Sequence, residues 1–387
     1  MVQPRWWSLA WPGLCATLTG VGFARFSYTA LIPFLVGAGE VSATQADYLG
    51  AANLAGYFLG AWIASALAQR LGSALCIRGG FVLTALGLGL CVIPGGFWWI
   101  APWRLLTGIT GGVLMVLGPS FLLTQAPPAV RGRIGGVIYA GVGLGAGFGS
   151  LLVAPLASIG PAWAWAGLAL GSALSAAITW TRWHDGFAGA APGAIRHAKT
   201  PITLPLLLGG LAFAADGAGF IPHSIFWADF VTRELGRGAA IGNATWLLFG
   251  FGAVFGPSLA GALGDRIGLS RALLVVFAIK SIAVAMPFVF TGLPLLAVSV
   301  LVVGALTPAI PAVFAGVVAE QVPARDQARL WGLATLGFGV AQAAGGWAFS
   351  YAYSLTDRYQ PLYLAGGAIE ALGAICALVA ILTARRG

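Results

Sequence analysis

Twelve apolar segments follow one another along the chain, separated by short polar stretches. A helix needs about 20 largely apolar residues to cross the hydrocarbon core of a bilayer, and each segment is about that long. Hydrophobic residues make up 59% of the 387 positions and charged residues only 8%, against about a quarter in an ordinary soluble domain. The pattern excludes a soluble fold and predicts an all-α membrane protein with twelve transmembrane helices.

The longest polar segment divides these helices into two sets of six. It contains His184, Asp185, Arg196, His197, Lys199 and Pro201, and its composition is typical of a linker. We therefore predict an N-terminal six-helix bundle over 1–181, a cytoplasmic linker over 182–203 and a C-terminal six-helix bundle over 204–387. The expected helices lie near 8–37, 45–68, 75–94, 97–124, 134–157, 161–181, 204–231, 240–263, 271–291, 294–318, 328–352 and 361–383.

The positions of the twenty basic residues predict the orientation in the membrane. Fourteen fall at the two termini or in alternate loops, and the opposite loops hold three, Arg233, Arg237 and Arg358. Cytoplasmic loops carry an excess of Lys and Arg, so we expect both termini in the cytoplasm and the chain in a bacterial inner membrane. The formal net charge of +9 then follows from topology and does not indicate nucleic-acid binding.

Signatures of enzymes, metal sites and cofactor sites are missing from the sequence. It has no H-E-x-x-H motif and no Walker loop, and its four cysteines stand singly in apolar stretches. The glycine-rich run at 141–149 lies within an apolar segment with no preceding strand, so helix packing explains it better than nucleotide binding. We expect no enzymatic activity, no metal and no cofactor, and we expect a monomer.

Loop residues carry a resemblance to a known family. The run from Gly261 to Arg271 is similar to the major facilitator loop signature, G-x-x-x-D-R-x-G-x-x-R. A weaker copy around Arg70 stands 196 residues before Arg266. The runs 22–28, 48–57 and 216–223 resemble, more narrowly, the YbfB/YjiJ branch of that superfamily. The resemblance implies the major facilitator fold, in which two pseudo-symmetric six-helix bundles surround a central cavity and move a small solute.

The same resemblance implies a set of gating residues at the cytoplasmic face. Asp265 is expected to approach the positive N-terminus of the fifth helix, where Arg131 and Arg133 lie close by. Such a contact between bundles would hold that face closed. The alternative is that Asp265 is a solvated loop charge. The gating residues predicted in this way are Asp265, Arg266, Arg271, Arg70, Arg131 and Arg133.

Five ionisable residues fall inside apolar segments, where a charge is costly and usually faces a cavity or a partner. Arg25 and Asp216 lie near the middle of the first and seventh helices, which line the central cavity in this superfamily. We predict that Arg25 binds an anion and that Asp216 gains and loses a proton. The alternative is a structural ion pair between the two.

Neighbouring residues complete the predicted site for substrate or protons. Tyr28 belongs to the same run as Arg25, and His223 follows Asp216 by two helical turns. An imidazole titrates near neutral pH, so His223 could relay a proton or bond substrate, although it could also be a satisfied histidine at the periplasmic end. Trp227 could stack on a flat substrate, but a tryptophan near a helix end is more often an interfacial anchor.

Arg104 begins a run, Arg104 to Gly112, that resembles the fourth-helix signature of proton-coupled drug exporters. An arginine there could tune the proton affinity of a nearby carboxylate, or it could extend to the membrane surface. Lys280 and Glu370 fall in the ninth and twelfth helices, and we expect them to form a structural intramembrane pair. The five groups sum to one surplus positive charge, which an anionic solute would balance.

These observations predict a proton-coupled secondary transporter of a small organic solute, anionic or amphipathic, that works by alternating access in the lipid bilayer. A facilitative organic-anion carrier or exchanger, in which Arg25 and Arg104 bind the anion and Asp216 is only structural, is the main alternative. A non-transporting membrane sensor or lipid-handling protein on the same scaffold is the third.

Overall fold

The computed structural model describes residues 6–184 and 201–384, without the side chains of 128, 129, 131–133, 324, 325 and 328. Within those residues the chain is helical, and the predicted all-α membrane architecture is confirmed. Eleven helical stretches there are long and apolar enough to cross a membrane. The remaining long helix, α13 (Ala324–Thr356), is less apolar because it carries several glycines and a central Gln342. The predicted linker residues 185–200 lie outside the described part.

The first group of helices comprises α1–α7. Its first crossing is α1 (Trp6–Thr17), a π-helical stretch η1 (Leu18–Phe26) and α2 (Ser27–Gly37). The next five crossings are α3 (Ala43–Leu71), α4 (Ser73–Leu90), α5 (Gly96–Leu123), α6 (Pro128–Ile159) and α7 (Pro161–Thr179). A 3₁₀ turn, η2 (Trp180–Arg182), follows α7.

The second group, α8–α14, begins with a crossing that is also broken. It consists of α8 (Leu204–Gly219), η3 (Pro222–Phe226), α9 (Trp227–Asp229) and η4 (Phe230–Glu234), with η3 and η4 π-helical. The other crossings are α10 (Ala239–Ile267), α11 (Leu269–Val289), α12 (Leu293–Gln321), α13 and α14 (Gln360–Ala384). π-helical turns are often found at functional sites, and here they carry Arg25 and His223.

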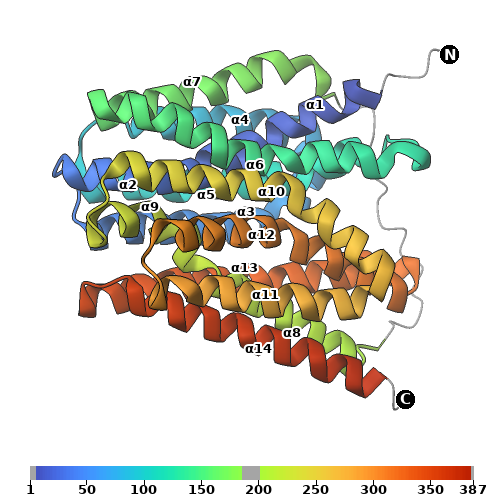
Figure 1. Ribbon diagram of the computed structural model, residues 1–387. Helices are drawn as coiled ribbons and strands as arrows, with labels where there is room; N and C mark the ends of the chain where they lie inside the picture. Colours follow the sequence, from blue (N-terminus) through green and yellow to red (C-terminus); the bar gives the residue numbers. More distant parts are fainter. Residues whose placement is uncertain (1–5, 185–200, 385–387) are drawn as a thin grey trace.

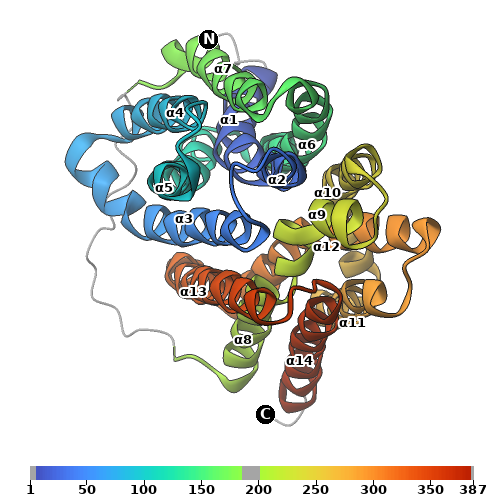
Figure 2. The same ribbon diagram turned by 90° about the vertical axis from the view of Figure 1, so that its left-hand side faces the viewer.

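The two groups lie side by side with their helices roughly parallel (Figures 1 and 2). α1 begins and α14 ends at the same end of the molecule, on the right in Figure 1. We call this the terminal end and the opposite one the distal end. The groups meet where α6 packs on α10 and α3 packs on α13. The exact bounds predicted for the two bundles and the linker stay a prediction.

A repeat at an offset of 196 residues is visible in the structure. Gly72 joins α3 to α4 and Gly268 joins α10 to α11, both with φ of 87°, a conformation that favours glycine. Within the helices, Gly60 of α3 lies against the backbone of α5 at Ile109, and Gly256 of α10 lies against α12 at Ala305. A Cβ atom on either glycine would overlap a carbonyl oxygen. The loop repeat around Arg70 and Arg266 therefore extends into equivalent helix packing.

Candidate solute and proton sites

Arg25 lies in η1 and reaches across to the second group of helices. Its Nη1 donates to the Gln342 Oε1 atom of α13 at 3.1 Å. The guanidinium carbon lies 5.6 Å from the centre of the Phe220 ring and 4.9 Å from that of Phe26, distances at which cation–π attraction operates. Its Nη2 atom is buried without a hydrogen-bond partner. The predicted alternative of an Arg25–Asp216 ion pair is wrong, because each side chain has other partners.

Arg104 lies on α5 with only 1% of its surface exposed. Its Nη1 donates to the carbonyl oxygen of Ala24 at 2.6 Å, and its guanidinium carbon lies 4.1 Å from the centre of the Tyr28 ring. The Nε atom has no hydrogen-bond partner. The alternative in which Arg104 extends to the membrane surface is therefore wrong.

Arg25 and Arg104 line one small cavity, which we call the arginine cavity. It measures about 10 Å³, room for about one water molecule. Asn53 is fixed beside it by bonds from its Nδ2 atom to the Arg104 carbonyl oxygen at 3.1 Å and the Thr107 hydroxyl at 3.2 Å. No carboxylate is among the lining residues, which are Arg25, Tyr28, Thr29, Gly50, Asn53, Leu54, Arg104, Ser224 and Ile225.

Guanidinium donors without carboxylate partners are suited to bind an anion, since Arg recognises carboxylate and phosphate through paired hydrogen bonds. Within the described part of the chain, neither Arg25 nor Arg104 forms a salt bridge. Ser224 and Ile225 come from η3 and the other lining residues come from the first group. The cavity is therefore completed across the boundary between the two groups.

Asp216, Lys280 and Glu370 form a second buried site, the Lys280 cluster. The Lys280 ammonium donates to Asp216 Oδ1 and lies 3.7 Å from Glu370 Oε1. All three side chains are fully buried. The predicted Lys280–Glu370 pair is present, but it belongs to a cluster of three that includes Asp216. Two carboxyl groups thus share one cation.

His223 and Trp227 are buried in the second group and do not reach the Lys280 cluster by any described hydrogen bond. The His223 Nε2 atom pairs with the Ser299 hydroxyl at 2.9 Å, while its Nδ1 atom has no partner. The Trp227 ring stacks on His223 at 4.8 Å, and its Nε1 donates to Thr245 at 3.0 Å. Because Trp227 is fully buried, the interfacial-anchor alternative is wrong.

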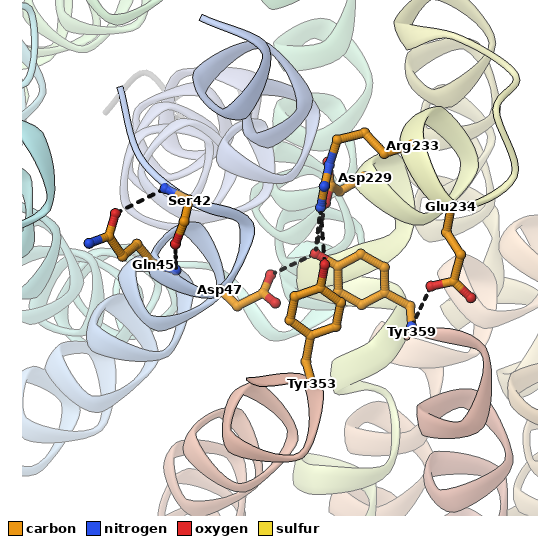
Figure 3. A network of polar contacts seen from close by, with 8 residues as sticks. All are labelled: Ser42, Gln45, Asp47, Asp229, Arg233, Glu234, Tyr353 and Tyr359. Atoms are coloured by element: carbon orange, nitrogen blue, oxygen red, sulfur yellow. Dashed lines mark hydrogen bonds and ion pairs between the residues drawn. The ribbon is translucent and has the colours of Figure 1, made fainter. Parts of the chain in front are cut away.

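A third polar site joins the two groups at the distal end (Figure 3). We call it the distal network; it consists of Asp47, Asp229, Arg233, Tyr353 and Tyr359. Arg233 binds both carboxylate oxygens of Asp229. The Tyr359 hydroxyl donates to Asp229 Oδ2 at 2.7 Å and contacts Asp47 Oδ1 at 3.3 Å. Asp47 belongs to α3 of the first group, whereas its partners all belong to the second.

Other hydrogen bonds between the groups also lie toward the distal end. The Thr29 hydroxyl donates to the Ser224 carbonyl oxygen, and Trp246 Nε1 donates to the Phe26 carbonyl oxygen at 3.0 Å. With the Arg25–Gln342 bond and the Tyr359–Asp47 contact, these bonds run from the middle of the molecule to its distal end. They hold the two groups together there.

The predicted gating residues lie at the terminal end. Asp265, Arg266, Arg271 and Arg70 are exposed at the ends of their helices. The side chains of Arg131 and Arg133 lie outside the described part, so the predicted contact with Asp265 stays a prediction. The distal network adds the buried Asp47 and Asp229 and the partly exposed Arg233 to the five charged residues predicted from the sequence. With them, four positive and four negative groups balance, so the overall surplus of positive charge disappears. The local charge of the arginine cavity remains positive.

Comparison with known proteins identifies the family. Residues 17–379 match the family described as "Uncharacterised MFS-type transporter YbfB". The mouse protein "Solute carrier family 2, facilitated glucose transporter member 6" is 34% identical over 125 residues, 32% of this chain and 24% of that protein. Its human counterpart is 33% identical over 130 residues, 34% of this chain and 25% of that protein. The chain therefore aligns with about a quarter of the length of these relatives.

A solved structure described as a D-xylose-proton symporter has a similar fold. The TM-score is 0.74 at 18% sequence identity, over 95% of this chain and 96% of the other. At that identity the likeness concerns the fold alone.

Proposed function

Because the chain belongs to the YbfB-type family of major facilitator transporters, we propose that it is a proton-coupled secondary transporter of a small organic anion. It is a multi-pass membrane transporter and not an enzyme, as its family and helices indicate. In the proposal it lies as a monomer in a bacterial inner membrane with both termini cytoplasmic, in keeping with the bias of Lys and Arg toward the terminal end. The distal end then faces the periplasm.

One observation carries the proposal: positive and negative groups are unequally divided between two buried sites. The arginine cavity has two guanidinium groups and no carboxylate, whereas the Lys280 cluster has two carboxyl groups and one ammonium. A buried charge without a partner is strongly disfavoured. An anion would offset the positive charge of the first site, in full if it carries two negative charges, and one proton would neutralise the second.

Alternating access connects the two sites in this proposal. The six-helix groups separate at one end as they close at the other, around a solute held near the middle of the membrane. Phe220 lies 5.6 Å from the Arg25 guanidinium carbon and 4.8 Å from the Lys280 nitrogen. In the proposal, a shift of this ring carries a change at the Lys280 cluster to the Arg25 guanidinium, so protonation of the cluster biases the position of one cation of the cavity.

The first experiment finds the solute by thermal stabilisation of the purified protein against a panel of organic acids, phosphate compounds and drugs at two pH values. A ligand stabilises the state that it binds, so true ligands raise the melting temperature. We expect hits among anions, with a larger rise at low pH. Hits confined to neutral or cationic compounds would contradict the proposed substrate class.

The second experiment tests coupling with Asp216→Asn in proteoliposomes. The variant leaves Lys280 with one carboxylate, Glu370, so the cluster is neutral without a proton. We expect loss of uphill uptake under an imposed pH gradient, while exchange of the solute across the membrane persists in part. Asp357→Asn, at an exposed carboxyl in the turn after α13, is the matched control and should transport normally. Undiminished uphill uptake by Asp216→Asn would contradict proton coupling through this cluster.

A facilitative carrier of organic anions is the second candidate, favoured by the direct ion pair between Asp216 and Lys280. In that case Asp216 is structural, and only the arginine cavity acts on the solute. Collapsing the proton gradient separates the two candidates, because it stops accumulation by a coupled transporter and leaves a facilitative carrier unaffected.

A further inference from the structure

The distal network contains one carboxyl group that has no donor of its own. Asp47 is fully buried on α3, its Oδ2 atom has no hydrogen-bond partner, and its Oδ1 atom lies 3.3 Å from the Tyr359 hydroxyl. That hydroxyl has a single proton, which it directs to Asp229 Oδ2 at the shorter distance of 2.7 Å. Asp47 therefore faces an oxygen whose proton is already used.

The hydroxyl of Tyr359 keeps its proton at ordinary pH. Tyr359 lies in the turn between α13 and α14, where burial, and then the neighbouring carboxylates of Asp47 and Asp229, raise the pKa of the phenol well above its usual range. It acts as a donor to Asp229 and as an acceptor from Arg233 Nη2 at 3.5 Å.

Asp47 forms no salt bridge within the described part of the chain, and Arg25 and Arg104 line the arginine cavity. The nearby cation, Arg233, is bound to both oxygens of Asp229. The nearby carboxylate of Glu234 accepts hydrogen bonds from the backbone N–H groups of Tyr359 and Gln360. The remaining titratable groups near Asp47 are tyrosines: Tyr353 of α13, Tyr363 of α14 and Tyr28 of α2, whose hydroxyl donates to the Ala46 carbonyl oxygen at 2.8 Å.

We infer that Asp47 is a proton-binding site of the closed distal end, and that it holds a proton whenever the two helix groups are joined there. A protonated Asp47 supplies its own O–H donor toward the Tyr359 oxygen. An ionised Asp47 would be an enclosed anion next to the Asp229 carboxylate, which is unfavourable. The inference rests on the proposed alternating access, because it assigns a proton to one of the two end states.

The Asp47–Tyr359 contact joins the two helix groups at the distal end, where they must separate during alternating access. Glu234 holds the turn before α14 against η4, so Tyr359 stays with the second group. Asp47 belongs to the first group and would move away with α3. Separation would expose Asp47 to water on the distal side, where an ordinary aspartate ionises. The closed state therefore binds more protons than the open one, and a falling pH favours closure.

The test measures the distance across the distal end in the full-length protein, in detergent and without any ligand. Spin labels are placed at Ala38→Cys, after α2, and Ala240→Cys, in the first turn of α10, both exposed, in a background with the native cysteines replaced. Between about pH 5 and about pH 8, the ratio of open to closed molecules should rise by up to about tenfold per pH unit, as one linked proton requires.

Two variants and one control decide the result. Asp47→Asn imitates the protonated form and should remain closed at both pH values. Asp229→Asn releases Arg233 to neutralise Asp47, so this variant should also lose the pH response. It replaces Asp47→Asn in the test if that variant does not fold. Glu40→Gln, at a carboxyl just before α3 whose pKa is raised by partial burial, should respond like the wild type.

A wild-type distance that does not change with pH would overturn the inference, and so would a full pH response in Asp47→Asn or Asp229→Asn. The readout needs no solute. If transport fails while the distance still depends on Asp47, then the proposed function is wrong and the inference about Asp47 stands.

Discussion

The arginine cavity and the Lys280 cluster differ in the sign of their unbalanced charge, although both are buried and both lie near Phe220. The cavity keeps guanidinium donors free and is completed by residues of both helix groups. The cluster lies wholly within the second group, on α8, α11 and α14. The difference indicates a division of tasks: a site on the boundary can exchange a solute as the groups move, and a site inside one group can keep a proton through the movement.

The largest expected effect comes from removing the cation of the Lys280 cluster. Lys280→Met leaves two buried carboxyl groups without a counter-charge, and breaking a buried pair in this way costs about 3–5 kcal/mol. We expect a large fall in melting temperature or failure to fold. Restoring balance with Asp216→Asn and Glu370→Gln in the same chain should recover most of the stability. A single Lys280→Met variant as stable as the wild type would show that the cluster is already neutral without lysine.

The charge pattern of the arginine cavity and the Lys280 cluster could be predicted from the sequence only in part. Arg25, Arg104, Asp216, Lys280 and Glu370 stand out because charged residues are rare in apolar segments. Their pairing could not be read in full, because Lys280 reaches two helices at once. The sequence favoured a pair with Glu370, and the structure adds Asp216.

Other residues were missed because their sequence context was ordinary. Asp47 lies in the second turn of α3, after a capping box formed by Ser42 and Gln45, where an acid is commonly explained by the helix dipole. Only the approach of Tyr359 from a distant turn gives it a function. Gln342 did give a signal, as a lone amide within an apolar segment, and it contacts Arg25. The π-helical turns of η1 and η3 depend on tertiary packing, so helical periodicity could not predict them.

A smaller effect is expected at the arginine cavity. Arg104→Gln keeps much of the side-chain volume but removes the charge, and a hydrogen bond to a charged group contributes about 1.5–3 kcal/mol. We expect anion affinity to fall by roughly 10- to 100-fold, measured as lost thermal stabilisation by the anion found in the screen. Arg182→Gln, at an exposed arginine after α7, is the matched control. Unchanged anion affinity in Arg104→Gln would show that the arginine cavity is not part of the anion-binding site.

The smallest effect is expected from removing the Arg25–Gln342 hydrogen bond between the two helix groups. Gln342→Leu removes the amide that orients Arg25, and a single hydrogen bond contributes about 1 kcal/mol. Anion affinity should therefore fall by about fivefold, with little change in the pH dependence of binding. Gln125→Leu, at the terminal end, where its amide bonds the Phe121 carbonyl oxygen at 2.9 Å, should leave affinity unaltered.

The division of tasks is tested most directly by the accumulation ratio of the anion in proteoliposomes under an imposed pH gradient, with wild type, Asp216→Asn and Arg104→Gln prepared side by side. The account predicts accumulation above equilibrium for the wild type, equilibration without accumulation for Asp216→Asn, and greatly reduced uptake of any kind for Arg104→Gln. Accumulation by Asp216→Asn equal to that of the wild type, or loss of coupling with intact uptake in Arg104→Gln, would contradict it.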